Sequence, residues 1–304
     1  MHFYGGTRNE IRRWRIADGH KVGEQTGMDM NDISVSRDHK WVVCGTMRQG
    51  ASVCDAELQR KVVEVEGRKY VDAVDVSPES TRFATGTRGM DKDVSIWSIT
   101  TGERLVGPLE HDSGVTGIKF FLDGGRIATA CDTSIYIFDS YSGHQLITIK
   151  NRLYDPGEIT PIVWPFDGRL FAISEGGKIK SFDTSTGSQI AEWQIHSYES
   201  GGAMSIALSA NNRFIASSAG HSVSFWDTST HTQLGSLLGD DDRIRCMALS
   251  PDGAHLATGG YNNKTITIWN LSDILPESYV PVKVSTTFPM FRRPITFVYQ
   301  STFL

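Results

Sequence analysis

Three acidic residues each stand directly before an apolar segment that is expected to form a strand: Asp32, Asp72 and Glu158. Converging carboxylate oxygens are the ligands that hard cations such as Ca²⁺ require, and a bound metal ion can drive hydrolysis. The matching places elsewhere in the chain hold Gly114, Ala203, Arg243 and Pro294. Because this set is broken, contains a cation and supplies no histidine ligand, solvated turn carboxylates are the favoured interpretation.

A second candidate for chemistry is His111 with Asp132, since a histidine beside a carboxylate can act as a general base. The chain contains no phosphate-binding GxxxxGK[ST] sequence, no GxSxG nucleophile turn and no HExxH metal motif. Its four cysteines show no CxxC spacing and predict buried free thiols; they are Cys44, Cys54, Cys131 and Cys246. The sequence therefore predicts no catalytic residue, no metal site and no cofactor.

Two repeated features identify the elements that carry these residues. Apolar strands end in an aromatic residue or its stand-in at intervals of 40 to 44 residues, at Trp14, Cys54, Trp97, Phe138, Phe182, Trp226 and Trp269. A turn similar to Ser-Pro-Asp-Gly keeps step, with its third residue at Asp38, Glu79, Asp123, Asp167, Asn211 and Asp252. This period is typical of propeller blades, so we predict an all-β, seven-bladed β-propeller of four-stranded antiparallel blades, with strands a to d from the channel outward.

Length and composition agree with one closed domain over residues 1–304. Seven blades absorb all 304 residues, and 39% hydrophobic with 21% charged residues suits short strands joined by tight turns. A net charge of -5 argues against a nucleic-acid binder that works by neutralising phosphates. No run of 18 apolar residues or secretory signal profile is present. We therefore expect a protein that does not enter the membrane and is cytoplasmic or also nuclear.

The repeats closely resemble the WD-repeat family. The marker dipeptide is intact at Trp226-Asp227, and softened forms stand at Phe138-Asp139, Phe182-Asp183, Cys54-Asp55 and Trp269-Asn270. The resemblance covers nearly the whole chain and is specific for the fold, not for a function.

This resemblance implies that a structural tetrad of His, Ser or Thr, Asp and Trp fixes the turns of a blade. In the fourth blade His111, Thr129 and Asp132 match, but Phe138 replaces Trp. The third blade keeps Thr85, Asp91 and Trp97, with Arg68 near the histidine position. In the seventh blade Thr258 and Trp269 remain, Asn263 replaces Asp, and Asp240 stands at the histidine position. Such residues satisfy buried polar groups, so a structural role is preferred to a catalytic one.

The chain termini predict how the ring closes. The chain starts where strand b of the first blade is expected, and Ile295 to Tyr299 reads as a strand a. We therefore predict that a closing strand at about residues 294–300 completes the first blade, which avoids open sheet edges. The alternative is a frayed tail on a piece of a longer protein.

Propellers of this family resemble one another in binding partners on the face formed by the d–a and b–c connections, at the channel mouth. Exposed aromatic and arginine side chains there are types enriched in interface hot spots. The partner-binding candidates are Tyr70, Arg88, Tyr154, Tyr198 and Arg243, with Met90 on the same loops. The acidic run Asp240 to Asp242 would favour a basic partner segment.

These observations favour a non-enzymatic scaffold or adaptor that presents propeller loops to proteins or peptides, as a monomer within a larger complex. Two alternatives stay open: a metal-dependent propeller hydrolase or lactonase that uses Asp32, Asp72 and Glu158, and the sensor portion of a larger receptor or ligase. The sequence does not identify the partners, the pathway, the binding face or whether the chain is complete.

Overall fold

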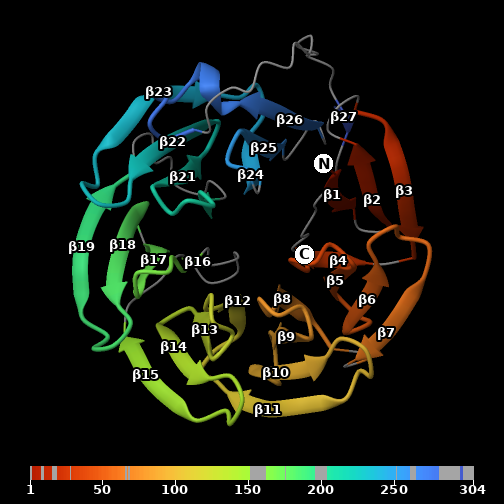
Figure 1. The fold of residues 1–304 in the computed structure, drawn as a ribbon. Coiled ribbons are helices and arrows are strands. Elements are labelled where there is room, and N and C mark those ends of the chain that lie inside the picture. Colours follow the sequence, from red (N-terminus) through yellow and green to blue (C-terminus); the bar gives the residue numbers. More distant parts are fainter. Residues whose placement is uncertain are drawn as a thin grey trace.

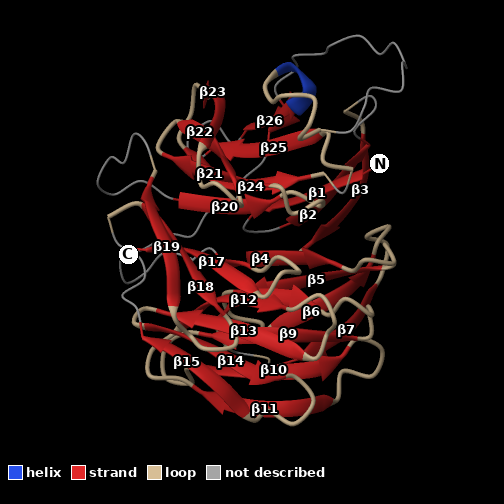
Figure 2. Cartoon of the chain, turned by 60° about the vertical axis from the view of Figure 1, so that its left-hand side comes forward, coloured by secondary structure: helices blue, strands red, loops and turns tan. Residues whose placement is uncertain are grey.

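Seven antiparallel sheets surround a central axis in the computed structural model, and each sheet is one blade of a propeller (Figure 1). The structure describes residues 2–7, 10–15, 19–27, 29–65, 67, 69–150, 162–174, 176–195, 204–250, 252–260, 265–280 and 295–296. Strands make up almost all of the regular structure, and the short helix η1 (Leu271–Asp273) follows the last long strand (Figure 2).

Each blade is formed by consecutive strands of the chain. The first blade contains β1 (His2–Thr7), β2 (Glu10–Arg15) and β3 (Lys21–Thr26). The second contains β4 (Met30–Val35), β5 (Trp41–Thr46), β6 (Ala51–Asp55) and β7 (Lys61–Val65). The third contains β8 (Val71–Val76), β9 (Arg82–Thr87), β10 (Asp93–Ser98) and β11 (Arg104–Glu110). The fourth blade contains β12 (Val115–Phe120), β13 (Arg126–Cys131), β14 (Ser134–Asp139) and β15 (Gln145–Lys150). The fifth contains β16 (Ile162–Val163), β17 (Arg169–Ser174), β18 (Lys178–Asp183) and β19 (Gln189–Gln194).

The sixth blade contains β20 (Met204–Leu208), β21 (Phe214–Ala219), β22 (Ser222–Asp227) and β23 (Gln233–Gly239). The seventh contains β24 (Ile244–Leu249), β25 (His255–Gly260), β26 (Thr265–Asn270) and β27 (Ile295–Thr296). The predicted all-β, seven-bladed propeller is therefore confirmed, and six of its sheets have four strands.

Burial falls from the channel outward. Every residue of β8 and β9 is buried, whereas the outer strand β11 of the same blade has no buried residue. The inner three strands are covered on both sheet faces by neighbouring blades, which explains their continuous apolar and small residues. The outer strand β11 instead has only partly buried and exposed positions.

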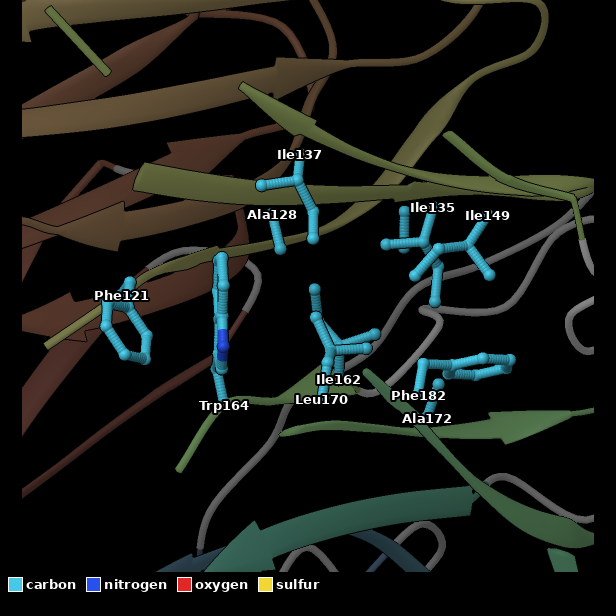
Figure 3. Close-up of a cluster of buried hydrophobic side chains, with 11 residues drawn as sticks. Phe121, Ala128, Ile135, Ile137, Ile149, Ile162, Trp164, Leu170, Ala172 and Phe182 are labelled. Atoms are coloured by element: carbon cyan, nitrogen blue, oxygen red, sulfur yellow. The ribbon is translucent and has the colours of Figure 1, made fainter. Parts of the chain in front are cut away.

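The core lies between blades and not within one. One of the large clusters joins the fourth and fifth blades, where Ile137 of β14 and Leu170 of β17 are fully buried (Figure 3). Phe182, one of the periodic aromatic residues, belongs to the same cluster. A blade therefore cannot bury its own faces and needs both neighbours.

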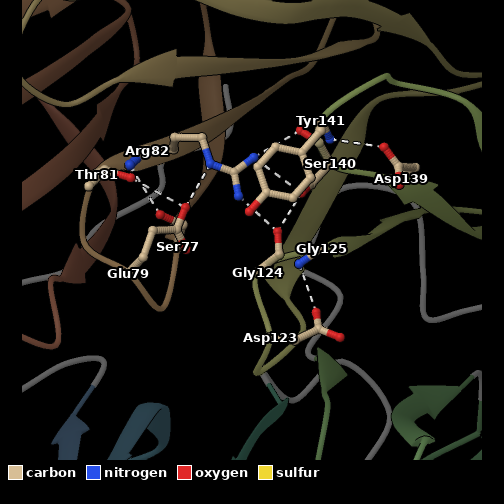
Figure 4. Close-up of polar contacts among 10 residues, drawn as sticks. All are labelled: Ser77, Glu79, Thr81, Arg82, Asp123, Gly124, Gly125, Asp139, Ser140 and Tyr141. Atoms are coloured by element: carbon tan, nitrogen blue, oxygen red, sulfur yellow. Dashed lines mark hydrogen bonds and ion pairs between the residues drawn. The ribbon is translucent and has the colours of Figure 1, made fainter.

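Arg82 is a polar link between the third and fourth blades (Figure 4). Its side chain is 8% exposed, and its Nε donates to Glu79 Oε1 at 2.7 Å. The two terminal nitrogens cross to the next blade, where they donate to the carbonyl oxygens of Ser140 (3.0 Å) and Gly124 (2.8 Å). The ring of Tyr141 covers the guanidinium, with the carbon Cζ 4.1 Å from the ring centroid. The planar fork of the guanidinium group donates to both carbonyl oxygens at once, which the single amino group of a lysine cannot do in the same geometry.

The predicted ring closure was wrong for the part of the closing strand that the structure describes. β27 pairs with β26, with Ile295 opposite Ile266, and is the outer strand of the seventh blade. The chain after β26 does not return at once as strand d, because Leu271, Leu275 and Val280 pack against the sixth blade. The outer edge of β26 is then filled by the later residues. Residues 294 and 297–300 of the predicted strand lie outside the described residues.

Side-chain packing joins the first and last blades. Trp14 of β2 is 5% exposed and packs against Ala257 and Ile266 of the seventh blade. On its other side the first blade contacts the second, where the Tyr4 hydroxyl donates to the Ala56 carbonyl at 2.8 Å. The first blade has three strands among the described residues.

Two further expectations can be compared with the structure. All four cysteines are free, and three are buried, but Cys246 is exposed, so the prediction of burial was wrong for that residue. Its strand, β24, is an inner strand in which partly buried and exposed residues alternate after Ile244. No helix within the described residues is long and apolar enough to cross a membrane.

We predict that Arg82→Lys lowers the free energy of unfolding by about 2–3 kcal/mol, because two buried carbonyl groups lose their charged donors. Urea denaturation followed by tryptophan fluorescence measures this change. Arg126→Lys is the matched control: Arg126 begins the same strand of the next blade and stacks on Phe121 and Trp164, a contact that lysine can retain. Equal losses in the two variants would contradict the role of the fork.

Candidate interaction surface at the channel mouth

Consecutive strands are antiparallel, so the b–c and d–a connections of all blades lie on one face and the a–b and c–d turns lie on the other. On the first face the structure brings together two sequence-predicted residues, Tyr70 before β8 and Arg88 after β9. The Arg88 amide donates to the Tyr70 carbonyl at 3.2 Å. Tyr70, on the connection from β7 to β8, is 47% exposed, and Met90, on the same β9–β10 connection as Arg88, is 100% exposed.

A polar chain connects this loop to the neighbouring blade. Arg88 Nε lies 2.6 Å from Asp72 Oδ2 in an ion pair. The other oxygen, Asp72 Oδ1, accepts a hydrogen bond of 2.8 Å from the amide nitrogen Nδ2 of Asn31 in β4. Asn31 is buried, so the chain fixes the Arg88 loop of the third blade against the second.

Two further contacts hold the same loop. A Cβ atom at Gly114 would lie 2.7 Å from Arg88 Cγ, so the absence of a side chain there lets the arginine stem pack closely. Lys69 Nζ lies 3.4 Å from Asp93 Oδ2, while Asp93 Oδ1 accepts a hydrogen bond of 2.7 Å from Thr87. Tyr70 and Met90 are therefore presented by two framed, adjoining connections.

Deeper in the channel, side chains of one blade bind the backbone amides of the next inner strand. Asp32 Oδ2 accepts from Val74 N at 2.9 Å, and Asp75 Oδ2 accepts from Phe120 N at 2.8 Å. The inner edge of a blade has no further strand to pair with, so these carboxylates satisfy donors that would otherwise depend on water. Lys119 Nζ adds an ion pair of 2.8 Å to Asp75 Oδ1.

The enclosed channel changes the acidities of these groups. Burial raises the pKa of Asp32 to about 6, although the amides of Val74 and Ile33 oppose the change. Burial also raises the pKa of Asp72, against the opposing effect of Arg88. For Lys119, burial lowers the pKa but attraction to Asp75 outweighs it, so the pKa is raised.

The acids singled out as a metal site do not converge. Asp32 and Asp72 were expected before their inner strands, but they lie inside β4 and β8. Asp32 accepts backbone amides, and Asp72 is engaged by Asn31 and Arg88. Glu158 lies outside the described residues. Within the described part of the chain, no three His, Cys, Asp or Glu side chains are grouped to hold a metal ion.

The remaining predicted partner residues are spread around the ring. Arg243 is half-buried and precedes β24, which lies across the channel from β8 (Figure 1). The structure therefore does not join it to Tyr70 and Arg88. Tyr154 and Tyr198 lie outside the described residues.

Hydrogen bonds connect most of the tetrad remnants. Trp97 Nε1 donates to Thr85 Oγ1 at 2.9 Å, and His111 Nε2 lies 2.7 Å from Thr129 Oγ1. His111 Nδ1 lies 2.9 Å from the Leu109 carbonyl oxygen, and burial lowers the pKa of this histidine. Both ring nitrogens are thus engaged in the frame, which argues against a general base.

The acidic members of the tetrads contribute differently. Asp132 donates its backbone amide to Ser113 Oγ at 3.2 Å, and Asp91 Oδ1 lies 3.8 Å from Lys69 Nζ. Lys69 holds the acids of the third blade. Arg68, which was expected near the histidine position, lies outside the described residues. In the seventh blade Trp269 donates to Thr258 (3.0 Å) and Thr258 to Asp240 (2.9 Å).

Sequence reasoning missed Asn31, Asp75 and Lys119. A signal for two of them was present, because Asp75 and Lys119 each stand four residues before the third residue of a periodic turn, Glu79 and Asp123. Opposite charges at one register position of adjacent blades indicate a pair across the blade boundary.

We predict that the stability of Asp32→Asn relative to the parent protein rises by about 1–2 kcal/mol from pH 4 to pH 7.5, because the variant has no carboxylate to ionise in the channel. The folded-state pKa of about 6 exceeds the ordinary value of 3.8, so the folded protein binds a proton that the unfolded chain releases between these values. Ionised Asp32 therefore lowers the free energy of unfolding by its full amount above pH 6, and this loss of stability is absent below about pH 4.

Urea denaturation from pH 4 to 7.5 tests this pH dependence. Asp38→Asn is the matched control, because hydrogen bonds from Ser36 and Lys40, which outweigh burial, lower the pKa of Asp38. That variant should lose stability at neutral pH, the opposite sign. A pH-independent difference between Asp32→Asn and the parent protein would contradict the assignment.

The geometry can be set beside known proteins. A family model described as "WD domain, G-beta repeat" matches residues 59–98, 104–139, 187–227 and 231–270, together more than half of the chain. Each matched segment ends at the close of a c strand, at Ser98, Asp139, Asp227 and Asn270.

Two similar curated proteins are the nuclear distribution protein nudF of Aspergillus niger and a guanine nucleotide-binding protein subunit beta of Oryza sativa subsp. japonica. The first is 29% identical over 167 residues, which is 46% of this chain and 37% of that protein. The second is 32% identical over 101 residues, 31% of this chain and 26% of that protein. The matches thus span less than two-fifths of these relatives.

Solved structures show the same architecture. The Cps50 (Swd1) β-propeller domain of Myceliophteria thermophila superposes with a TM-score of 0.74 at 15% identity, over 88% of this chain and 92% of that one. The computationally designed protein Ika8 gives 0.66 at 20% identity, over 88% and 79%. These likenesses show the fold. With the family model, the seven sheets and the periodic c strands, they establish that the chain belongs to the WD-repeat β-propeller family.

Proposed function

We propose that this protein is a non-enzymatic scaffold that binds protein partners on the channel-mouth surface of its second and third blades. WD-repeat propellers commonly mediate protein–protein interaction. The observation that carries the proposal is the exposure of Tyr70 and Met90 on two adjoining connections, which the Arg88–Tyr70 backbone hydrogen bond joins and which Asn31, Asp72 and Arg88 frame.

Such a surface has the features of an interaction hot spot. Tyrosine and methionine provide large contact areas, and a framed loop loses little conformational entropy when a partner binds. The chemistry expected of an enzyme is not assembled there, since the carboxylates of Asp32 and Asp72 are engaged by protein donors. The relative from Oryza sativa subsp. japonica, which is named as a subunit of a guanine nucleotide-binding protein, supports a role within an assembly.

We expect a Tyr70→Ala, Met90→Ser variant to lose partners that the parent protein captures from the native cell extract. Removing two exposed side chains leaves the frame intact, so the melting temperature should be unchanged. Leu146→Ser is the matched control, because Leu146 is 47% exposed on the outer strand β15, away from the channel mouth. Quantitative mass spectrometry of the captured proteins measures the difference. If the loop variant and the control recover the same partners, the channel-mouth surface is not the binding face.

A further inference from the structure

The opposite face of the ring, formed by the a–b and c–d turns, carries three exposed apolar side chains on the fourth and fifth blades. Leu122 is 43% exposed, Tyr141 is 64% exposed and Phe166 is 58% exposed. Leu122 and Phe166 occupy the same position of consecutive a–b turns, one residue before Asp123 and Asp167. We refer to Leu122, Tyr141 and Phe166 as the turn-face patch.

The patch lies on a rigid base. Phe121 and Trp164, beside Leu122 and Phe166, are buried with ring centroids 4.8 Å apart across the blade boundary (Figure 3). The guanidinium of Arg126 covers both rings, at 4.3 and 5.4 Å from their centroids.

Tyr141 is tied to the same base. Its neighbour Ser140 donates its backbone amide to the Gly125 carbonyl at 2.9 Å, which joins the c–d turn to the a–b turn that carries Leu122. The Tyr141 ring rests on the buried Arg82 guanidinium (Figure 4). The turns that carry the three exposed side chains are therefore held in place before any partner arrives, which lowers the entropic cost of binding.

The fold itself does not require these side chains. The residue at the position of Leu122 and Phe166 differs in other a–b turns that the structure describes: it is Arg37, Pro78 and Ala210. The place of Tyr141 in the next two c–d turns is taken by Ser185 and Ser229. Polar or small residues thus form the same turns, and the apolar surface needs another explanation.

The turns that carry the patch are rich in carboxylates. The four turns of these two blades contain Asp123, Asp139, Asp167 and Asp183. Arg169 pairs with Asp167 at 2.5 Å and the guanidinium of Arg126 stacks on rings, so Asp123, Asp139 and Asp183 supply the negative charge of these turns. Hydrogen bonds from Ser142 lower the pKa of Asp139, and hydrogen bonds from Ser185 lower the pKa of Asp183. An apolar centre with a negative rim complements an apolar side chain flanked by cations.

We propose that the turn face of the fourth and fifth blades binds a protein segment in which a large apolar residue is flanked by lysine or arginine. This site is separate from the channel-mouth surface, because the two faces are formed by opposite ends of the strands. The protein then has two independent docking surfaces, one on each face of the ring.

The test uses the whole chain and a short fluorescein-labelled peptide in which leucine and lysine alternate, followed by fluorescence anisotropy. Saturable binding is expected, with weaker binding to a serine–lysine peptide of the same charge and none to a leucine–glutamate peptide. Leu122→Ser with Phe166→Ser should weaken binding about tenfold or more. Asp123→Asn with Asp183→Asn keeps the oxygens that accept turn amides and should weaken binding most at low salt.

Leu146→Ser with Ile190→Ser is the matched control, since these residues are 47% and 50% exposed on the outer strands of the same two blades. It should leave peptide binding unchanged, and equal melting temperatures establish that all variants are folded. Three results would overturn the proposal: no saturable binding of the leucine–lysine peptide, equal weakening by the control, or a dimer in sedimentation that Phe166→Ser converts to monomer. Loss of binding by Tyr70→Ala would instead assign the peptide to the channel mouth and likewise overturn it.

Discussion

The contact between adjacent blades is the constraint on which the rest of the structure depends. The inner strands of the third to sixth blades are mostly buried, and the residues that bury them belong to neighbouring blades, as Ile137 and Leu170 show at one boundary. No blade can therefore be stable alone, and closing the ring is a condition for every core at once. The first and last blades meet this condition through Trp14, Ala257 and Ile266.

Polar groups serve the same boundaries wherever apolar packing cannot. The inner edge of each blade presents amides with no strand to pair with, and Asp32 and Asp75 accept two of them. Near the opposite face, Arg82 satisfies carbonyl oxygens of the next blade. The charge of Asp32 costs stability in the enclosed channel, and the same carboxylate satisfies the amide of Val74.

The parts of the fold that repeat could be predicted from the sequence, and the parts that do not repeat could not. The aromatic series at the c strands and the turns between strands a and b gave seven blades and most strand positions, because each motif reports a local conformation. Ring closure depends on which of two free edges the last strand pairs with. The register of Ile295 with Ile266 comes from the detour of Leu271 to Val280, which no periodic motif encodes.

The candidate surface shows the same division. Tyr70 and Arg88 were found because their loop positions follow from the strand count, whereas the partners Asn31 and Asp72 come from different strands and had to be placed by the fold. The sequence allowed Asp32 and Asp72 to be interpreted as possible metal ligands because it did not fix the first residue of each inner strand to within a residue or two. Inside β4 and β8, each carboxylate meets its own protein donors.

The degenerate tetrads follow from the distribution of stability around the ring. Packing between blades supplies most of the burial, so one blade can replace a tetrad member without losing the turn, provided that the remaining polar groups find partners. Lys69 with Asp93, and Asp240 with Thr258, are two such replacements. The same tolerance frees turn positions for other purposes: a turn that forms with Arg37 or Pro78 also forms with Leu122 or Phe166, and the side chain chosen there alters the surface and not the frame.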